Sequence, residues 1–331
     1  MKKNSVIVSC LVLSLLVLFV GCKREASDIS RGKRQYHRGS YDRAIRDFNL
    51  ALKVNPQSAE AYCGRGLSFL AKGDRDRAIA DFAKAIEISP LPQFYYARGL
   101  VWQEIKDDDK AIKDYTSTIN VAPDYWAAYI NRAQLYKNKK EFDRAIVDYN
   151  KAIELSPGDI KAYSSRADAW YEKGDYKEAV KDYTKILETD KNNVRALYDR
   201  GIIFYETREV KRAIDDFEGA IQLKPDYVEV YNNYAWILAT CVEERYRDGK
   251  KAVTLAKKAV QLRKDTDAID TLAAAYAEAG DFEAAIQTQK EFINTQKNKL
   301  TAEDLNEAEK QLESYQNHKP WRDTKIWAGA V

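Results

Sequence analysis

Small and apolar residues recur along this chain at the spacing of one face of a helix. The stretch DRAIVDYNKAIELSP, residues 143–157, has close copies at 42–56, 76–90 and 211–225. Its alanine returns every 33 or 34 residues, with one interval of 39, at Ala44, Ala78, Ala111, Ala145, Ala179, Ala213, Ala252 and Ala285. An aromatic residue follows the first six alanines four positions later, at Phe48, Phe82, Tyr115, Tyr149, Tyr183 and Phe217. Because an offset of four lies on one helix face, whereas a strand requires alternation, each copy predicts a helix.

A second helical pattern stands upstream of most copies. It has an aromatic residue or leucine, a small residue four positions later and an aromatic residue seven positions later. The instances are Tyr62-Gly66-Phe69, Tyr95-Gly99-Trp102, Tyr129-Ala133-Tyr136, Tyr163-Ala167-Trp170 and Leu197-Gly201-Phe204. Each repeat is therefore a pair of helices of roughly fourteen residues, a length that is marginal for an isolated helix. The small residue lets the two helices approach closely, and a further copy covers the apolar face that one pair leaves open.

These residues, at this period, resemble the tetratricopeptide repeat (TPR) family in eight consecutive copies over residues 25–293. The resemblance implies an all-α fold, a right-handed α-solenoid of about eight helix pairs. We expect the copies at 25–58, 59–91, 92–125, 126–159, 160–193, 194–227, 228–265 and 266–293. The seventh copy departs from the pattern, because five extra residues separate its helices and Ala256 stands at the aromatic position; Gln289 stands there in the eighth.

The residues after the last copy predict an end to the stack. A capping helix is expected at 299–316, where Thr301 and Asp304 have the spacing of a helix start. Such a helix would cover the last open apolar face. The tail at 317–331 has no periodicity, and we expect its Trp321 and Trp327 to dock on the end of the stack.

The first residues have the layout of a secretion signal. Two lysines precede an apolar run of fifteen residues from Val6 to Val20, shorter than the roughly 20 that span a membrane as a helix. The ending Leu18-Phe19-Val20-Gly21-Cys22 resembles the lipobox of bacterial lipoproteins. That resemblance implies cleavage of a signal peptide at 1–21, diacylation of Cys22 and a short tether at 22–24. The alternatives are an ordinary secreted form and an uncleaved single-helix anchor.

The charge is balanced overall but not along the chain. Lys and Arg total 54 against 51 for Asp and Glu, so nothing calls for a nucleic-acid partner. Residues 23–53, however, hold nine basic side chains against four acidic ones. Next to a lipid on Cys22, this basic end would lie against anionic headgroups, where each Lys or Arg adds about 1 kcal/mol. We expect a cell-envelope protein, lipid-anchored to a bacterial membrane, on the periplasmic face of the outer membrane in a cell with two membranes.

Paired charges recur with the repeats. Arginine stands three positions after the first-helix aromatic residue or leucine, at Arg65, Arg98, Arg132, Arg166 and Arg200, with Arg31 in phase. Aspartate precedes each second-helix aromatic residue, at Asp47, Asp81, Asp114, Asp148, Asp182 and Asp216. In the seventh copy Tyr234 and Leu255 replace both charges together. We expect an Arg–Asp ladder, either within a repeat (Arg132 with Asp148) or across a junction (Asp148 with Arg166). The alternative is that duplication copied two solvated residues.

Residues suited to catalysis are scarce. The two histidines, His37 and His318, stand at opposite ends of the chain, and the sequence has no GxGxxG, GxxxxGK[ST], HExxH or paired CxxC motif. The acidic run 107–109 is placed at a turn and lacks further ligands. We therefore expect no enzymatic activity, no metal and no cofactor. Cys63 and Cys241 lie five repeats apart, too far for a disulfide.

The resemblance implies that the first helices line a concave groove that takes a protein or peptide. Residues one position beyond the core stripe should face it: Tyr96, Leu100, Ile130, Gln134, Asp168, Tyr171, Tyr198, Ile202, Tyr205 and Trp236. The alternative for the aromatic members is packing between neighbouring first helices. The Lys, Asn and Arg cluster with which some members of the family grip a C-terminal carboxylate is absent. Acidic residues gather in the later copies, which favours a partner with apolar and basic side chains.

We therefore expect a membrane-anchored adaptor that binds a partner protein or peptide in its groove. Two alternatives remain open. One is a structural subunit of a cell-envelope assembly, held by lateral contacts. The other is a regulator or carrier of envelope hydrolases.

Overall fold

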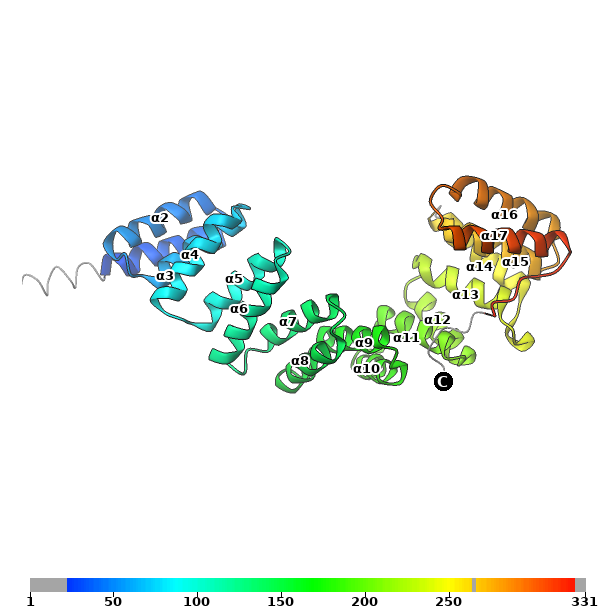
Figure 1. Cartoon of the computed structure of the whole chain (residues 1–331), viewed down its shortest axis with the longest axis horizontal. Coiled ribbons are helices and arrows are strands. Elements are labelled where there is room, and N and C mark those ends of the chain that lie inside the picture. Colours follow the sequence, from blue (N-terminus) through cyan, green and yellow to red (C-terminus); the bar gives the residue numbers. More distant parts are fainter. Residues whose placement is uncertain (1–22, 264–265, 325–331) are drawn as a thin grey trace, which may run out of the picture. The chain divides into compact units, whose positions relative to one another are not determined.

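The computed structural model describes residues 23–263 and 266–324, which form helices and no strand (Figure 1). Residues 23–37 are helical. The helices that follow are α2 (Tyr41–Val54), α3 (Ala59–Ala71), α4 (Arg75–Ile88), α5 (Pro92–Glu104), α6 (Asp108–Val121), α7 (Trp126–Asn138), α8 (Phe142–Leu155), α9 (Ile160–Lys173), α10 (Tyr176–Thr189), α11 (Val194–Glu206), α12 (Val210–Leu223), α13 (Val228–Thr240), the 3₁₀ helix η1 (Glu244–Tyr246), α14 (Gly249–Leu262), α15 (Thr266–Glu278), α16 (Phe282–Gln296) and α17 (Ala302–Gln316).

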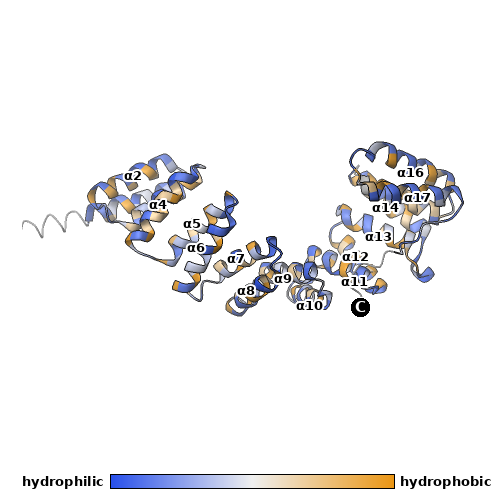
Figure 2. Ribbon diagram, in the orientation of Figure 1, coloured by the Kyte–Doolittle hydropathy of each residue, from blue (hydrophilic) through white to orange (hydrophobic). Residues whose placement is uncertain are grey.

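The chain divides into two compact units, which meet in the sequence at Ala162 and Tyr163. In the first unit α3 packs on α4, α5 on α6 and α7 on α8, and each pair contacts the next. In the second unit α11 packs on α12, α13 on α14 and α15 on α16. The all-α stack of helix pairs predicted from the sequence is therefore confirmed. Hydrophilic and hydrophobic residues share the same helices in both units (Figure 2).

The repeated alanine and aromatic residue of the second helix form the core of each pair. All eight alanines are fully buried. Where the small residue of the first helix is Gly66, Gly99 or Gly201, the ring four positions after the alanine lies against it. A methyl group added to Gly99 would come within 2.8 Å of the Tyr115 ring, and one added to Gly201 within 2.7 Å of the Phe217 ring. Both distances are shorter than carbon atoms tolerate in contact, so glycine is needed where these rings fill the space.

Aspartates cap the second helix at several of the turns between paired helices. Asp74, Asp107, Asp175 and Asp281 each accept a hydrogen bond from the backbone N–H three residues later, which satisfies a free donor at the helix start. Asp107, from the acidic run 107–109, thus caps α6.

The five extra residues of the seventh copy form a loop between α13 and α14 that contains η1. Arg247 holds it: its guanidinium donates to the carbonyl oxygens of Cys241 and Val242, both at 3.1 Å, and to Glu278 of α15 at 3.0 Å. The loop is thereby fastened to the next helix pair.

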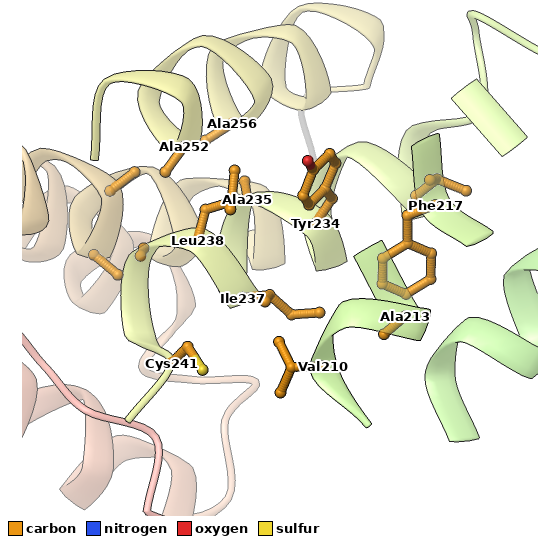
Figure 3. Close-up of a cluster of buried hydrophobic side chains, with 14 of the residues drawn as sticks. Val210, Ala213, Phe217, Tyr234, Ala235, Ile237, Leu238, Cys241, Ala252 and Ala256 are labelled. Carbon is orange, nitrogen blue, oxygen red and sulfur yellow. The ribbon is translucent and has the colours of Figure 1, made fainter. Parts of the chain in front are cut away.

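Tyr234 stands on α13 at the position of the ladder arginine, and it is buried. It lies near Phe217 and Ala256 in the buried cluster of Figure 3, with ring centroids 6.5 Å apart for Tyr234 and Phe217. Its hydroxyl donates to Glu218 at 2.6 Å and accepts from Lys251 at 2.7 Å. A different polar contact therefore stands where the first six copies have an arginine and an aspartate.

Helix α17 covers the end of the second unit. Its Tyr315 is fully buried with Ala273, Ala277 and Ala285, and Trp321 of the tail packs against this cluster. Gln289, which stands at the aromatic position, is buried and donates to Asp270 at 2.8 Å and to Gln311 of α17 at 3.0 Å. The second expected tail residue, Trp327, lies outside the described residues.

Candidate functional site

The recurrent charges form bidentate ion pairs within five of the helix pairs. Nε of the arginine lies 2.7 or 2.8 Å from one carboxylate oxygen, and Nη2 contacts the other. The pairs are Arg65–Asp81, Arg98–Asp114, Arg132–Asp148, Arg166–Asp182 and Arg200–Asp216. Arg31 likewise contacts Asp47 at 2.7 Å. The geometry is thus the first of the two expected, a contact within the repeat, and all of these aspartates are buried.

Some of these arginines also reach the preceding helix pair. Nη1 of Arg132 donates to Thr116 at 3.0 Å, and Nη1 of Arg200 donates to Thr184 at 3.1 Å. Each guanidinium therefore joins its own pair to the one before it. The threonines were missed by sequence reasoning, although both stand two positions after the ladder aspartate of their copy.

Two of the tyrosines expected to line the groove contact the neighbouring first helix instead. The hydroxyl of Tyr96 accepts from Asn131 at 3.0 Å, and its ring lies 4.9 Å from Tyr125. In the second unit Tyr198 makes the same contacts with residues 35 and 29 positions later, Asn233 at 3.1 Å and Tyr227 at 5.2 Å. Burial raises the pKa of Tyr198 to about 12. The repeated offsets of 29 and 35 are a signal in the sequence that could have revealed this packing.

The remaining groove candidates of the first unit differ in accessibility. Leu100 is 39% exposed and presents an apolar surface. Gln134 accepts a hydrogen bond from Tyr149 at 3.3 Å and donates to Asn138 at 3.0 Å. Ile130 does not belong to an open groove, because only 6% of it is exposed. Burying an isoleucine gains about 1.5–3 kcal/mol, which explains why the fold covers this side chain.

Two candidates of the second unit bond to other side chains. Asp168 accepts from the hydroxyl of Tyr183 at 2.6 Å. The hydroxyl of Tyr171 donates to Oε1 of Glu206 at 2.6 Å, so it connects α9 to α11.

Ile202, Tyr205 and Trp236 meet at a pocket of about 590 Å³ in the second unit. Residues from α11, α12, α13, α15, α16, α17, the connection between α16 and α17, and the C-terminal tail line it. Its lining includes five carboxylates and, among the described residues, no lysine or arginine. The carboxylates belong to Glu206, Asp270, Asp304, Glu307 and Asp323. An acidic, partly aromatic hollow of this kind suits a cationic group with an apolar stem.

The C-terminal tail forms one wall of this pocket. The carboxylate of Asp323 accepts from the hydroxyl of Tyr205 and from Nε1 of Trp236, both at 3.1 Å, and its N–H donates to the carbonyl of Thr240 at 3.0 Å. Arg322 forms an ion pair with Glu278 at 2.7 Å. Burial, and then the nearby charge of Asp323, raise the pKa of Tyr205 above its ordinary value. Sequence reasoning did not predict that the tail contributes to the site.

Glu206 and Asn232 carry acceptor atoms that the described part of the fold leaves without a hydrogen-bond donor. These atoms are Oε2 of Glu206 and Oδ1 of Asn232, and both residues line the pocket. Glu206 is 8% exposed, and burial raises the pKa of its carboxyl. Buried acceptors normally have a partner, so this pair marks a place where a donor fits.

No group of three or more His, Cys, Asp or Glu residues in the described ranges is arranged to hold a metal ion. The thiols of Cys63 and Cys241 are free, and burial raises the pKa of Cys63 to about 11, which disfavours a reactive thiolate. Cys22 lies outside the described residues. Within them, no helix combines the length and the apolar character needed to cross a membrane.

The sequence matches two family profiles, both described as Tetratricopeptide repeat. One matches residues 126–159, and the other matches 29–91 and 164–228. Comparison with curated proteins finds no match.

Solved structures give further likenesses. MamA is 30% identical, with 50% of this chain and 96% of that chain covered and a TM-score of 0.47. The C-terminal part of a TPR repeat-containing protein from Cytophaga hutchinsonii has a TM-score of 0.64 at 20% identity, over 74% of this chain and 99% of that one. YrrB, a TPR protein with an unusual peptide-binding site, has a TM-score of 0.51 at 19% identity, over 56% and 96%. The last two likenesses concern the fold.

Proposed function

The chain belongs to the tetratricopeptide repeat family, whose members are generally scaffolds for protein–protein interaction, and from this premise we propose that it is a membrane-anchored adaptor. Its partner is a protein or peptide that lies along the first helices and presents apolar and basic side chains. The lipid on Cys22 holds the adaptor at the cell envelope, and the protein itself carries out no catalysis.

The pocket of the second unit carries this proposal. Aromatic side chains and carboxylates converge on one hollow, which is the composition expected of a site that recognises an apolar and basic segment. In the first unit the exposed Leu100 offers an apolar contact on a first helix.

Site-specific photo-crosslinking in cells tests the adaptor role. A photo-reactive phenylalanine at Leu100 or at the pocket residue Leu300 should give one discrete adduct, and mass spectrometry should identify the same partner from both positions. Val147 and Leu223 are matched controls, because both are exposed apolar residues on second helices. Equal adducts at the control positions, or none at Leu100, would contradict binding along the first helices, and the absence of an adduct at Leu300 would contradict binding in the pocket.

Metabolic labelling with a palmitate analogue tests the anchor separately. Wild-type protein should incorporate the label and lose residues 1–21, because acylation of Cys22 accompanies removal of the signal. Cys22→Ser should remain unlabelled, whereas the control Cys63→Ser should be labelled like the wild type. Label on the Cys22→Ser protein would disprove this anchor. The nine basic side chains of residues 23–53 support the proposal, since they would add electrostatic attraction to anionic headgroups.

A further inference from the structure

We propose that the pocket of the second unit binds the guanidinium of an arginine presented by an extended segment of the partner. This inference rests on the proposed adaptor function and names the side chain that the adaptor recognises. The Glu206 carboxylate and the Asn232 amide oxygen receive the guanidinium, and aromatic residues of the same pocket receive its aliphatic stem.

The two unpartnered acceptors carry the argument. Glu206 uses one carboxylate oxygen for the hydroxyl of Tyr171 and keeps the other, Oε2, buried without a donor. Oδ1 of Asn232, a residue of α13, is likewise buried without a donor. A buried acceptor left unpaired costs about 1–3 kcal/mol, and more for a charged group. A ligand with several N–H donors removes that cost at both residues.

The charge of the pocket lining favours a cationic donor over a neutral one. The described residues of the lining include five carboxylates and no lysine or arginine. A neutral amide could satisfy the same two acceptors but would gain nothing from this charge. A hydrogen bond to a charged group contributes about 1.5–3 kcal/mol, roughly twice the neutral bond.

The shape of the donor favours arginine over lysine. A guanidinium is planar and offers five N–H donors, so it can bond a carboxylate oxygen and an amide oxygen at once. It is also less strongly hydrated than an ammonium group and stacks on aromatic faces. Trp236 and Tyr205 line the pocket with their polar atoms fixed by Asp323, so both rings are held in place for such contact.

Fluorescence anisotropy with two peptide pools provides the test. Both are labelled nonapeptide pools, random except for the central residue, which is arginine in one and its neutral isostere citrulline in the other. Full-length protein in detergent should bind the arginine pool at least about tenfold more tightly. Glu206→Gln should abolish this preference without lowering the thermal unfolding midpoint, because it removes a buried charge and keeps an acceptor for Tyr171.

Controls separate this site from the rest of the molecule. Glu209→Gln changes an exposed carboxylate outside the pocket lining and should keep the preference. A chain that ends at Thr324 should keep it as well. Equal affinity for the two pools would mean that water alone satisfies the acceptors and would overturn the proposal, as would loss of the preference in the shortened chain. If Leu300 crosslinks to a partner but the protein shows no preference for the arginine pool, the adaptor function is supported and only the guanidinium site is refuted.

Discussion

Asp148→Ala is expected to lower the free energy of unfolding of the first unit by about 3 kcal/mol. The Asp148 side chain is 6% exposed and holds Arg132 by two hydrogen bonds of 2.7 and 2.8 Å, and the Arg132 side chain is itself only 15% exposed. Removing the carboxylate leaves a buried guanidinium that retains a neutral partner, Thr116. The effect should appear as a lower urea midpoint when unfolding is followed by circular dichroism.

Glu154→Ala on the same helix is the matched control. Its ion pair with Lys151 is exposed, so the change should cost less than about 0.5 kcal/mol. A double-mutant cycle between Arg132 and Asp148 should give a coupling of at least about 1 kcal/mol. Replacing both residues, as Arg132→Met with Asp148→Leu, should restore much of the lost stability. A coupling below about 0.3 kcal/mol would show that the ladder does not stabilise the fold.

Gly249→Ala is expected to lower the free energy of unfolding of the second unit by about 3 kcal/mol, since added atoms force closely packed helices apart. A Cβ at this position would lie 2.5 Å from the backbone nitrogen of Ala279 and 2.6 Å from the carbonyl carbon of Glu278. Backbone atoms cannot rotate away as the end of a side chain can, so α14 would have to move from α15. Loss of secondary structure in the urea titration measures the cost.

Gly219→Ala is the same substitution at another site, and it is expected to have the opposite effect on the free energy of unfolding. Gly219 lies inside α12, and its nearest neighbour would be the Cδ1 of Leu197 at 3.6 Å, an ordinary contact. Alanine in a helix interior is favoured over glycine by roughly 0.5–1 kcal/mol, so this variant should be slightly more stable. If both variants unfold at the same urea concentration, the close approach at Gly249 does not limit the packing.

The helix pairs could be predicted from the sequence because their period is strong and local. Buried alanines and rings such as Ala145 and Tyr149 recur at equivalent positions in successive copies. The same helical interpretation therefore applies to each of these copies. The ladder could be anticipated as well, since Arg132 and Asp148 keep their spacing. The choice between contact within a repeat and contact across a junction depends on side-chain direction, which spacing alone does not give.

The groove was harder to predict, since one position beyond the core stripe can face a partner or a neighbouring helix. At that position Ile130 is buried and Leu100, on the preceding first helix, is open. Tyr96 and Tyr198 are held by asparagines 35 residues on.

The pocket could not be predicted, because it joins residues that no periodicity connects. Asp323 comes from an aperiodic tail and contacts Tyr205, 118 positions earlier in the chain. Asp304 and Gln311 reach the pocket from α17. The acidic character of the later copies was visible in the sequence, but its concentration at one hollow depends on how the last helices fold together.

The contacts of Glu278 limit how the repeats can be exchanged in protein engineering. One of its carboxylate oxygens contacts Arg247 of the extra loop and the other contacts Arg322 of the tail. The seventh copy is therefore not an interchangeable module. Replacing it with a regular copy, as is routine in building consensus arrays, would remove one of the two cations that flank Glu278. We expect such a chimera to assemble its helices yet hold residues 321–323 loosely, so a recombinant array would need the loop and the tail transplanted together.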